Sequence, residues 1–276
     1  MKHPLYPAVT ALLTMSVMVW LPLGAARAQV AQAKGFEAPA VFQAAGPNSA
    51  SIQAAVDAYR LALGEVNNGN APGPLASGRR EINWDGGGST ATSLAATPFA
   101  GFLNTRGALF ATPGSGFVQA PASGLAETFA NPAYETIFQP FSPVRLFSPI
   151  DSNLTEVEFF VPGSGGGLNA STRGFGAIFS DVDLPDGSGP GGKRGNRKAS
   201  TLVEFYGVDG ELLYSNFVPA APGNAGFAFL GIAFDDARIA RVRISTGNST
   251  PGADDDRPRD VVVMDDFIFG EPQLAQ

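Results

Sequence analysis

The sequence predicts an all-β protein, a sandwich or barrel with one short helix near its N-terminus. Short apolar stretches alternate with clusters of Gly, Pro, Ser, Asn and Ala about every ten residues, which is the spacing of antiparallel sandwiches. The chain has 34 Gly and 22 Pro among 276 residues, so turns are frequent. Sustained helical periodicity occurs in a single stretch.

The first residues have the pattern of an export signal. An apolar run over 8–23 is followed by Ala26-Arg27-Ala28, the small-x-small motif that signal peptidases accept. We therefore expect a signal peptide over 1–28, a mature chain that starts at Gln29, and a secreted or periplasmic location. A membrane anchor is the alternative, but the run is interrupted by Thr, Ser and Pro and is shorter than the roughly 20 apolar residues of a span. No second apolar run follows, so no membrane span is expected in the mature form.

Charge and composition exclude several classes of function. The whole chain has 18 Lys+Arg and 25 Asp+Glu, and loss of the signal, with Lys2 and Arg27, makes the acidic excess larger. This balance argues against nucleic acid as a partner. The chain has no Cys, and its one His is His3 in the signal, so Ser-His-Asp and Cys-His nucleophiles are excluded. A bound metal must then have oxygen ligands, which favours calcium as the possible cofactor.

One domain is expected over 29–276, with an entry segment over 34–78 and the main sandwich over 79–272. The entry segment is predicted as a strand over 34–45, a helix from Ser51 to Leu63, and a Gly/Pro/Asn loop. The helix has one apolar face and a cap at Asn48 or Ser49. The residues of that face are Ile52, Val56, Tyr59 and Leu63.

The C-terminal half is predicted as strands and hairpins. The expected strands are 154–161 and 174–184, a hairpin over 202–218, a second hairpin over 226–234 and 238–245, and a closing strand over 260–269. The first hairpin turns at Asp209-Gly210, a dipeptide that tolerates positive φ. The closing strand is apolar on both faces, so it is expected in the centre of a sheet.

Four segments of this region carry a family resemblance: GFGAIFSDVDLP, VEFYGVDGELLYS, FAFLGIAFDDARIARVRISTG and DVVVMDDFIFGEP. The chain resembles exported bacterial β-sandwich proteins of uncharacterised function, many of which carry a C-terminal PEP-CTERM sorting tail. The resemblance implies a jelly-roll type β-sandwich similar to carbohydrate-binding modules. The chain ends without the spanning helix and basic tail of the sorted members, so cell-surface sorting is not expected.

Two acidic clusters are candidate calcium sites. Asp181, Asp183 and Asp186 lie at the end of a predicted strand and have the alternation of a calcium loop, although the third Asp comes one residue late and no matching Glu follows. Asp265 and Asp266 lie inside the apolar closing strand, where a carboxylate must meet a cation, an Arg or several backbone N–H groups.

The alternative interpretation needs no metal. In it these aspartates cap turns and accept main-chain hydrogen bonds, or they pair with Arg173 or Arg241.

Four aromatic residues are candidate sugar-binding groups, because an aromatic face can stack on a sugar ring. They are Trp84, Tyr134, Tyr206 and Tyr214. For Trp84 a core position is the favoured alternative, since it is flanked by Ile82 in a β-rich segment. The basic run over 193–198 is a second candidate, for an acidic glycan, or a solvated loop that faces the acidic run over 254–256.

The function that these observations favour is a secreted, non-catalytic binding or adhesion module, with glycan as the candidate ligand and calcium as the candidate structural ion. Its partner would be a polysaccharide or a cell-surface glycan. The alternative is a structural component of the envelope or the extracellular matrix without a small ligand. A hydrolase that uses carboxylates alone, such as Glu156 and Glu158, is the least favoured, because polar-out alternation on a strand explains that pair without chemistry.

Overall fold

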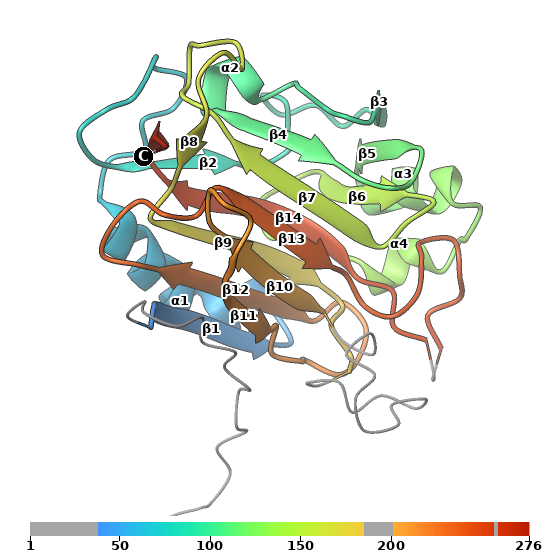
Figure 1. Ribbon diagram of the computed structural model, residues 1–276. Coiled ribbons are helices and arrows are strands. Elements are labelled where there is room, and N and C mark those ends of the chain that lie inside the picture. The colour runs from blue at the N-terminus through green and yellow to red at the C-terminus, as the bar shows by residue number, and fades with distance from the viewer. Residues whose placement is uncertain (1–37, 185–200, 257–258, 276) are drawn as a thin grey trace, which may run out of the picture.

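The computed structural model describes residues 38–184, 201–256 and 259–275. These residues form an all-β sandwich of two antiparallel sheets (Figure 1). The expected fold class is therefore confirmed, whereas jelly-roll connectivity stays a prediction. The signal peptide, Asp186 and the basic run over 193–198 lie outside the described residues.

The larger sheet has eight strands. In spatial order they are β1 (Ala40–Gly46), β12 (Phe227–Ala233), β9 (Gly174–Ser180), β14 (Val263–Gly270), β6 (Leu146–Ile150), β5 (Gly116–Ala120) and β3 (Ser93–Ala96), and β2 (Arg79–Ile82) also pairs with β14. All eight residues of β14 are buried. The closing strand is thus central, as its two apolar faces predict.

The smaller sheet has five strands. In spatial order they are β11 (Leu212–Phe217), β10 (Leu202–Tyr206), β13 (Arg241–Ser245), β7 (Leu154–Phe159) and β4 (Ala108–Ala111). The predicted hairpin of β10 and β11 is present, and its turn contains Gly210 with φ 79°. A short pair, β8 (Ala170–Ser171) and β15 (Gln273–Leu274), lies at one end.

The second predicted hairpin is wrong. Strand β12 belongs to the larger sheet and β13 to the smaller one, so the chain crosses between sheets after Ala233. The burial patterns give the reason. Every residue of β12 is buried, whereas β13 alternates between buried and half-buried residues, so the two strands suit different positions in the sandwich.

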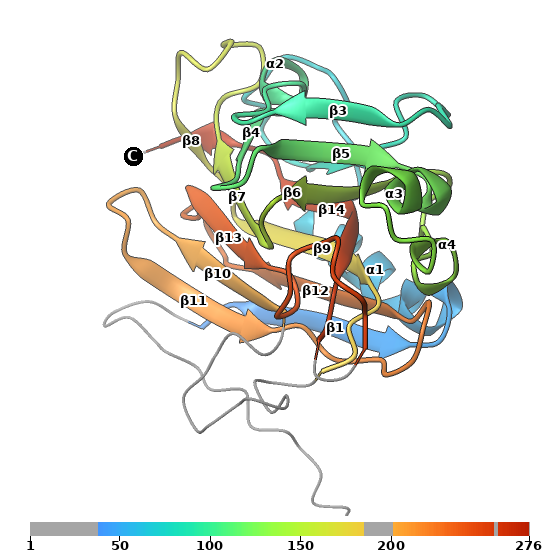
Figure 2. The same cartoon turned by 90° about the vertical axis from the view of Figure 1, so that its right-hand side faces the viewer.

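The main core lies between the two sheets and is rich in aromatic rings. Phe267 of β14 is fully buried there. Its ring centroid is 5.1 Å from that of Trp84 and 5.2 Å from that of Phe175. Figure 2 shows β10, β11 and β13 on one side of this core and the strands of the larger sheet on the other.

Helix α1 (Ser49–Leu63) covers the outer face of the larger sheet over β12 and β14 (Figure 1). The side chain of Asn48 caps it by accepting the Ser51 N–H at 3.1 Å. Its predicted apolar face is buried, and the Tyr59 hydroxyl donates to the Ile232 carbonyl at 3.1 Å. Gly176 makes room for this ring, because a Cβ there would lie 2.8 Å from Tyr59 Cε1.

Three further helices were not predicted: α2 (Leu103–Arg106), α3 (Ala122–Thr128) and α4 (Tyr134–Ile137). They have four to seven residues, too few to show a helical period in the sequence. Helices α3 and α4 pack together over a second apolar cluster that includes Val118 and Val263.

Candidate functional site

Trp84 lies in the core. Its side chain is fully buried, its ring stacks on Phe147 with 3.7 Å between centroids, and its indole N–H donates to the Asp265 carbonyl at 3.0 Å. A sugar could reach this ring only if the sandwich opened. The structure therefore places Trp84 in the core and not at a surface where a sugar could stack on it.

Tyr134 and Tyr214 are buried as well. The Tyr134 hydroxyl donates to the Ala253 carbonyl and accepts the Gly252 N–H, both at 2.8 Å, and so it ties α4 to the loop before β14. Tyr214 is 4% exposed and packs near the ring of Phe205. Neither ring presents a face to a ligand in this structure.

Tyr206 is the predicted aromatic residue that reaches the surface. It is half-buried on the outer face of the smaller sheet, in one cross-strand row with Arg241 of β13 and Glu158 of β7. The Arg241 guanidinium lies over its ring, 4.1 Å from the centroid, and Arg241 Nη1 donates to Glu156 Oε1 at 3.0 Å. The ring therefore supports Arg241, because a cation over an aromatic face is held by the ring quadrupole.

An open cavity of about 250 Å³ lies beside this row. Its polar side chains are Glu158, Asn169 and Arg241, and its apolar ones include Phe160 and Val208. Glu158 is exposed, and within the described ranges its carboxylate has no hydrogen-bond or ion-pair partner. The cavity thus combines an unpaired acceptor, an amide and a fixed guanidinium at the surface.

Asp265 and Asp266 form a β-bulge in β14. The register with β9 shifts between Met264 and Phe267, so these two aspartates face the single residue Ile178. Bulges turn a side chain out of the regular alternation and are frequent next to functional sites. Here the bulge brings two carboxylates together beneath the loop before β6.

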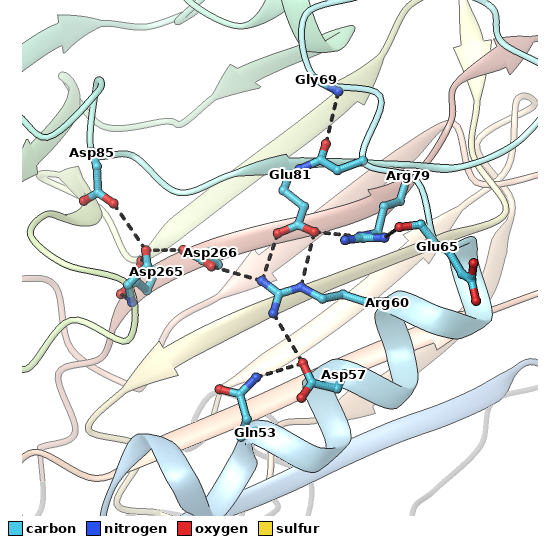
Figure 3. Close-up of polar contacts among 12 residues, drawn as sticks. Gln53, Asp57, Arg60, Glu65, Gly69, Arg79, Glu81, Asp85, Asp265 and Asp266 are labelled. Carbon is cyan, nitrogen blue, oxygen red and sulfur yellow. Dashed lines mark hydrogen bonds and ion pairs between the residues drawn. The ribbon is translucent and has the colours of Figure 1, made fainter.

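The donors for both carboxylates come from that loop and from α1. Asp265 Oδ2 accepts the N–H groups of Phe141 and Ser142 at 2.5 and 3.3 Å. Asp266 Oδ1 accepts from Ser142 Oγ at 2.5 Å, and its Oδ2 lies 3.6 Å from Arg60 Nη2. Figure 3 shows Arg60 between Asp266 and Glu81, whose Oε2 is 2.9 Å from Arg60 Nη2.

A third carboxylate, Asp85, belongs to the same cluster. Its Oδ1 accepts the N–H groups of Val144 and Arg145 at 2.6 and 2.9 Å, and its Oδ2 is 3.4 Å from Ser142 Oγ. The single hydroxyl proton of Ser142 cannot serve three acids at once. Burial, and after it the neighbouring Asp266, raises the pKa of Asp265 well above its ordinary value.

The aspartates of the closing strand were expected to meet backbone N–H groups or an Arg. Asp265 accepts backbone N–H groups and Asp266 lies next to an Arg, but that Arg is Arg60 and neither Arg173 nor Arg241. Arg173 donates to the Phe234 carbonyl, and Arg241 pairs with Glu156. Asp265 and Asp266 each have partners from the protein, and these contacts link the bulge of β14 to the loop before β6 and to α1.

A second acidic cluster lies at the end of β9, where four aspartates from two distant segments meet. Asp260 is fully buried, and its two oxygens accept the N–H groups of Asp183 and Leu184 at 3.3 Å each. Asp183 Oδ1 accepts the Gly223 N–H at 2.6 Å. Burial raises the pKa of Asp260 to about 7.

Asp181 and Asp255 complete this end cluster. Asp255 Oδ1 accepts the Val261 N–H at 2.8 Å. Asp181 is fully buried, and neither of its carboxylate oxygens has a donor. Burial is the largest cause, and the neighbouring Asp255 the second, of a rise in the pKa of Asp181 to about 9. A hydrogen bond between Asp181 and Asp255 can exist only while one of the two acids is protonated.

The structure has two separate acidic clusters: Asp181 and Asp183 lie in one, and Asp265 and Asp266 lie in the other. The sequence analysis did not identify Asp255 and Asp260 as neighbours of Asp181 and Asp183. The acidic run over 254–256 is a visible signal in the sequence, but its local spacing does not show that it meets Asp181 and Asp183. Glu158 and Asn169, beside Tyr206, were also missed as a pair, since they belong to different strands.

Comparison with protein-family models, with curated proteins and with solved structures finds no match to this chain. The resemblance to exported β-sandwich proteins therefore stays a prediction. Among the residues that the structure describes, no helix has the length and hydropathy needed to cross a membrane. In the same residues, no three acidic, histidine or cysteine side chains are already gathered as a metal centre.

Proposed function

We propose that this protein is an exported, non-catalytic module that binds glycan on the outer face of its smaller sheet. The observation that carries the proposal is the cavity lined by Glu158, Asn169 and Arg241. Sugar hydroxyl groups both donate and accept hydrogen bonds. An unpaired carboxylate, an amide and a guanidinium supply both kinds of partner within one surface site.

The support for Arg241 makes the site rigid before a ligand arrives. The ring of Tyr206 and the carboxylate of Glu156 hold the guanidinium, so less side-chain entropy is lost when it binds. The cavity of about 250 Å³ is smaller than the roughly 300–1,000 Å³ of closed small-molecule pockets. An open site of this size suits one sugar residue of a longer chain.

The test is binding of the mature chain to a glycan array, followed by titration calorimetry with the best glycan. Arg241→Ala should weaken that glycan about tenfold or more, since a hydrogen bond to a charged group contributes about 1.5–3 kcal/mol. Arg243→Ala is the matched control, because Arg243 is on the same face of β13 but does not line the cavity. It should change the affinity less than about twofold.

Three results would contradict the proposal in whole or in part. A blank array at millimolar glycan would favour the structural role without a small ligand. Equal losses in Arg241→Ala and Arg243→Ala would show that general positive charge, and not this cavity, attracts the glycan. Release of shorter sugars from the bound glycan would refute the non-catalytic part.

A further inference from the structure

We infer that the end cluster of Asp181, Asp183, Asp255 and Asp260 is a binding site for a hard divalent cation, with calcium as the expected ion. The inference is independent of glycan binding, because it concerns a different group of residues. Its starting point is the buried side chain of Asp181.

Asp181 is the anomaly of the cluster. Its residue is 0% exposed, its φ is 71°, and both of its carboxylate oxygens lack a hydrogen-bond donor. A buried ionised carboxylate without a partner is costly, and native proteins almost always supply one. Asp260 is equally buried, but each of its carboxylate oxygens accepts one backbone N–H. The two oxygens of Asp181 therefore call for a ligand that other groups do not provide.

The neighbours of Asp181 are acids. Asp255 lies beside it, and Asp183 and Asp260 are close enough to raise its pKa further. One oxygen each of Asp183 and Asp255 accepts a backbone N–H. Asp181 and Asp255 also share a side-chain hydrogen bond, which requires a proton on one of the two acids. When that proton leaves, the two oxygens of Asp181 and one oxygen each of Asp183 and Asp255 have no donor among the described residues, and these four can coordinate a cation.

No described cation neutralises this group. Arg259, in the same loop, pairs with Asp256 and Asp254 at 2.6 and 3.5 Å, and its side chain is 41% exposed. Its ion pairs are therefore with the two outer aspartates of the loop, and Asp255 experiences its charge without an ion pair. A ligand that carries positive charge is what the inner carboxylates lack.

The donor set selects the type of ion. It consists of carboxylate oxygens, without imidazole or sulfur, which favours calcium or magnesium over zinc and copper. The ligands come from two loops in irregular positions, and calcium accepts such a set more readily than magnesium, which demands near-ideal octahedral geometry. Among the described residues these carboxylates are not gathered around one point, so we expect Asp183 to move toward Asp181 and Asp255 when the ion binds.

The experiment uses the mature chain stripped with EDTA. Thermal melts and calorimetry with CaCl₂ up to 10 mM should show binding and a rise in Tm of about 5 °C or more at saturation, because the ion binds only the folded state. MgCl₂ at the same concentration should raise Tm less. Asp181→Asn should abolish the calcium response. Asp255→Asn, at a more accessible position, should weaken calcium at least about tenfold.

Asp235→Asn is the matched control for charge. Asp235 is exposed in the turn after β12. The Asp235→Asn variant removes one carboxylate, as the site variants do, so the response of this variant to calcium should equal that of the parent. If Asp181→Asn does not fold, Asp255→Asn decides, with calcium-displaceable terbium luminescence of the parent as the second readout.

Either of two results overturns the inference. One is an EDTA-stripped parent that shows neither heat nor a Tm shift with calcium, which would mean that a proton shared by Asp181 and Asp255 serves in place of a metal. The other is an equal rise in the parent and both site variants, which would mean general screening of an acidic protein.

Discussion

Truncation of Phe267 tests the packing that holds the two sheets together. Phe267 is fully buried in β14, and its ring is 5.1 Å from Trp84, 5.2 Å from Phe175, 5.9 Å from Phe147 and 6.0 Å from Phe110, measured between centroids. Phe→Ala in a core costs about 3–5 kcal/mol, and the cost rises with the cavity that remains.

The walls of this cavity cannot easily collapse. Strand β14 is paired on both sides, and the four rings come from strands and a loop that are held by their own hydrogen bonds. We therefore expect Phe267→Ala to lose about 4–5 kcal/mol, the upper part of that range. For a domain of this size this lowers Tm by about 8–20 °C.

The assay is urea unfolding of the mature chain followed by the fluorescence of Trp84, the tryptophan that is stacked in this core. Phe217→Ala, on the half-buried outer face of β11, is the control and should lose less than about 2 kcal/mol. If Phe267→Ala does not fold, Phe267→Leu should still cost more than the control. Equal losses in the core variant and the control would show that this ring cluster is not the centre of the fold.

Three further predictions concern polar groups and export. Asp265→Asn should flatten the dependence of stability on pH. The raised pKa of Asp265 gives the parent stability that is complete below the ordinary aspartate pKa of about 3.9 and is lost as pH rises toward the folded value. Urea unfolding of parent and variant at pH 5 and pH 8 measures this dependence. An equal change in the free energy of unfolding between the two pH values in both proteins would refute the prediction. Glu271→Ala should cost about 3–5 kcal/mol, because it leaves the buried guanidinium of Arg80, bound at 2.7 Å through two nitrogens, without its counter-charge; a loss below about 1 kcal/mol in chemical unfolding would contradict the burial of this pair. Exported material should begin at Gln29, and an intact mass that retains the apolar run would disprove cleavage.

Much of the fold could be predicted from local patterns. The apolar face of α1, the turn at Asp209-Gly210 and the central position of β14 all follow from spacing and from the residues themselves. Each is a property of one short segment, because side-chain periodicity records which faces of an element are buried.

Pairing between distant segments could not be predicted in this way. Strands β12 and β13 follow one another along the chain but belong to different sheets, and an apolar strand presents the same pattern whichever neighbour it has. The same limit applies to the polar groups. Arg80 and Glu271 are 191 residues apart, and the bulge carboxylate Asp266 meets Arg60 of α1.

For the candidate sites, too, local sequence patterns predicted some features and tertiary contacts decided the others. The sequence by itself determined that any metal ligands are oxygens, that the Asp181 segment is one place for them, and that Trp84 favours the core. Only the tertiary structure decided that Asp255 and Asp260 join Asp181, and that Tyr206 supports Arg241 beside Glu158. The reason is physical: a side chain's partners are set by strand register and by how loops meet at the sheet ends, and neither is recorded in the spacing of residues along one segment.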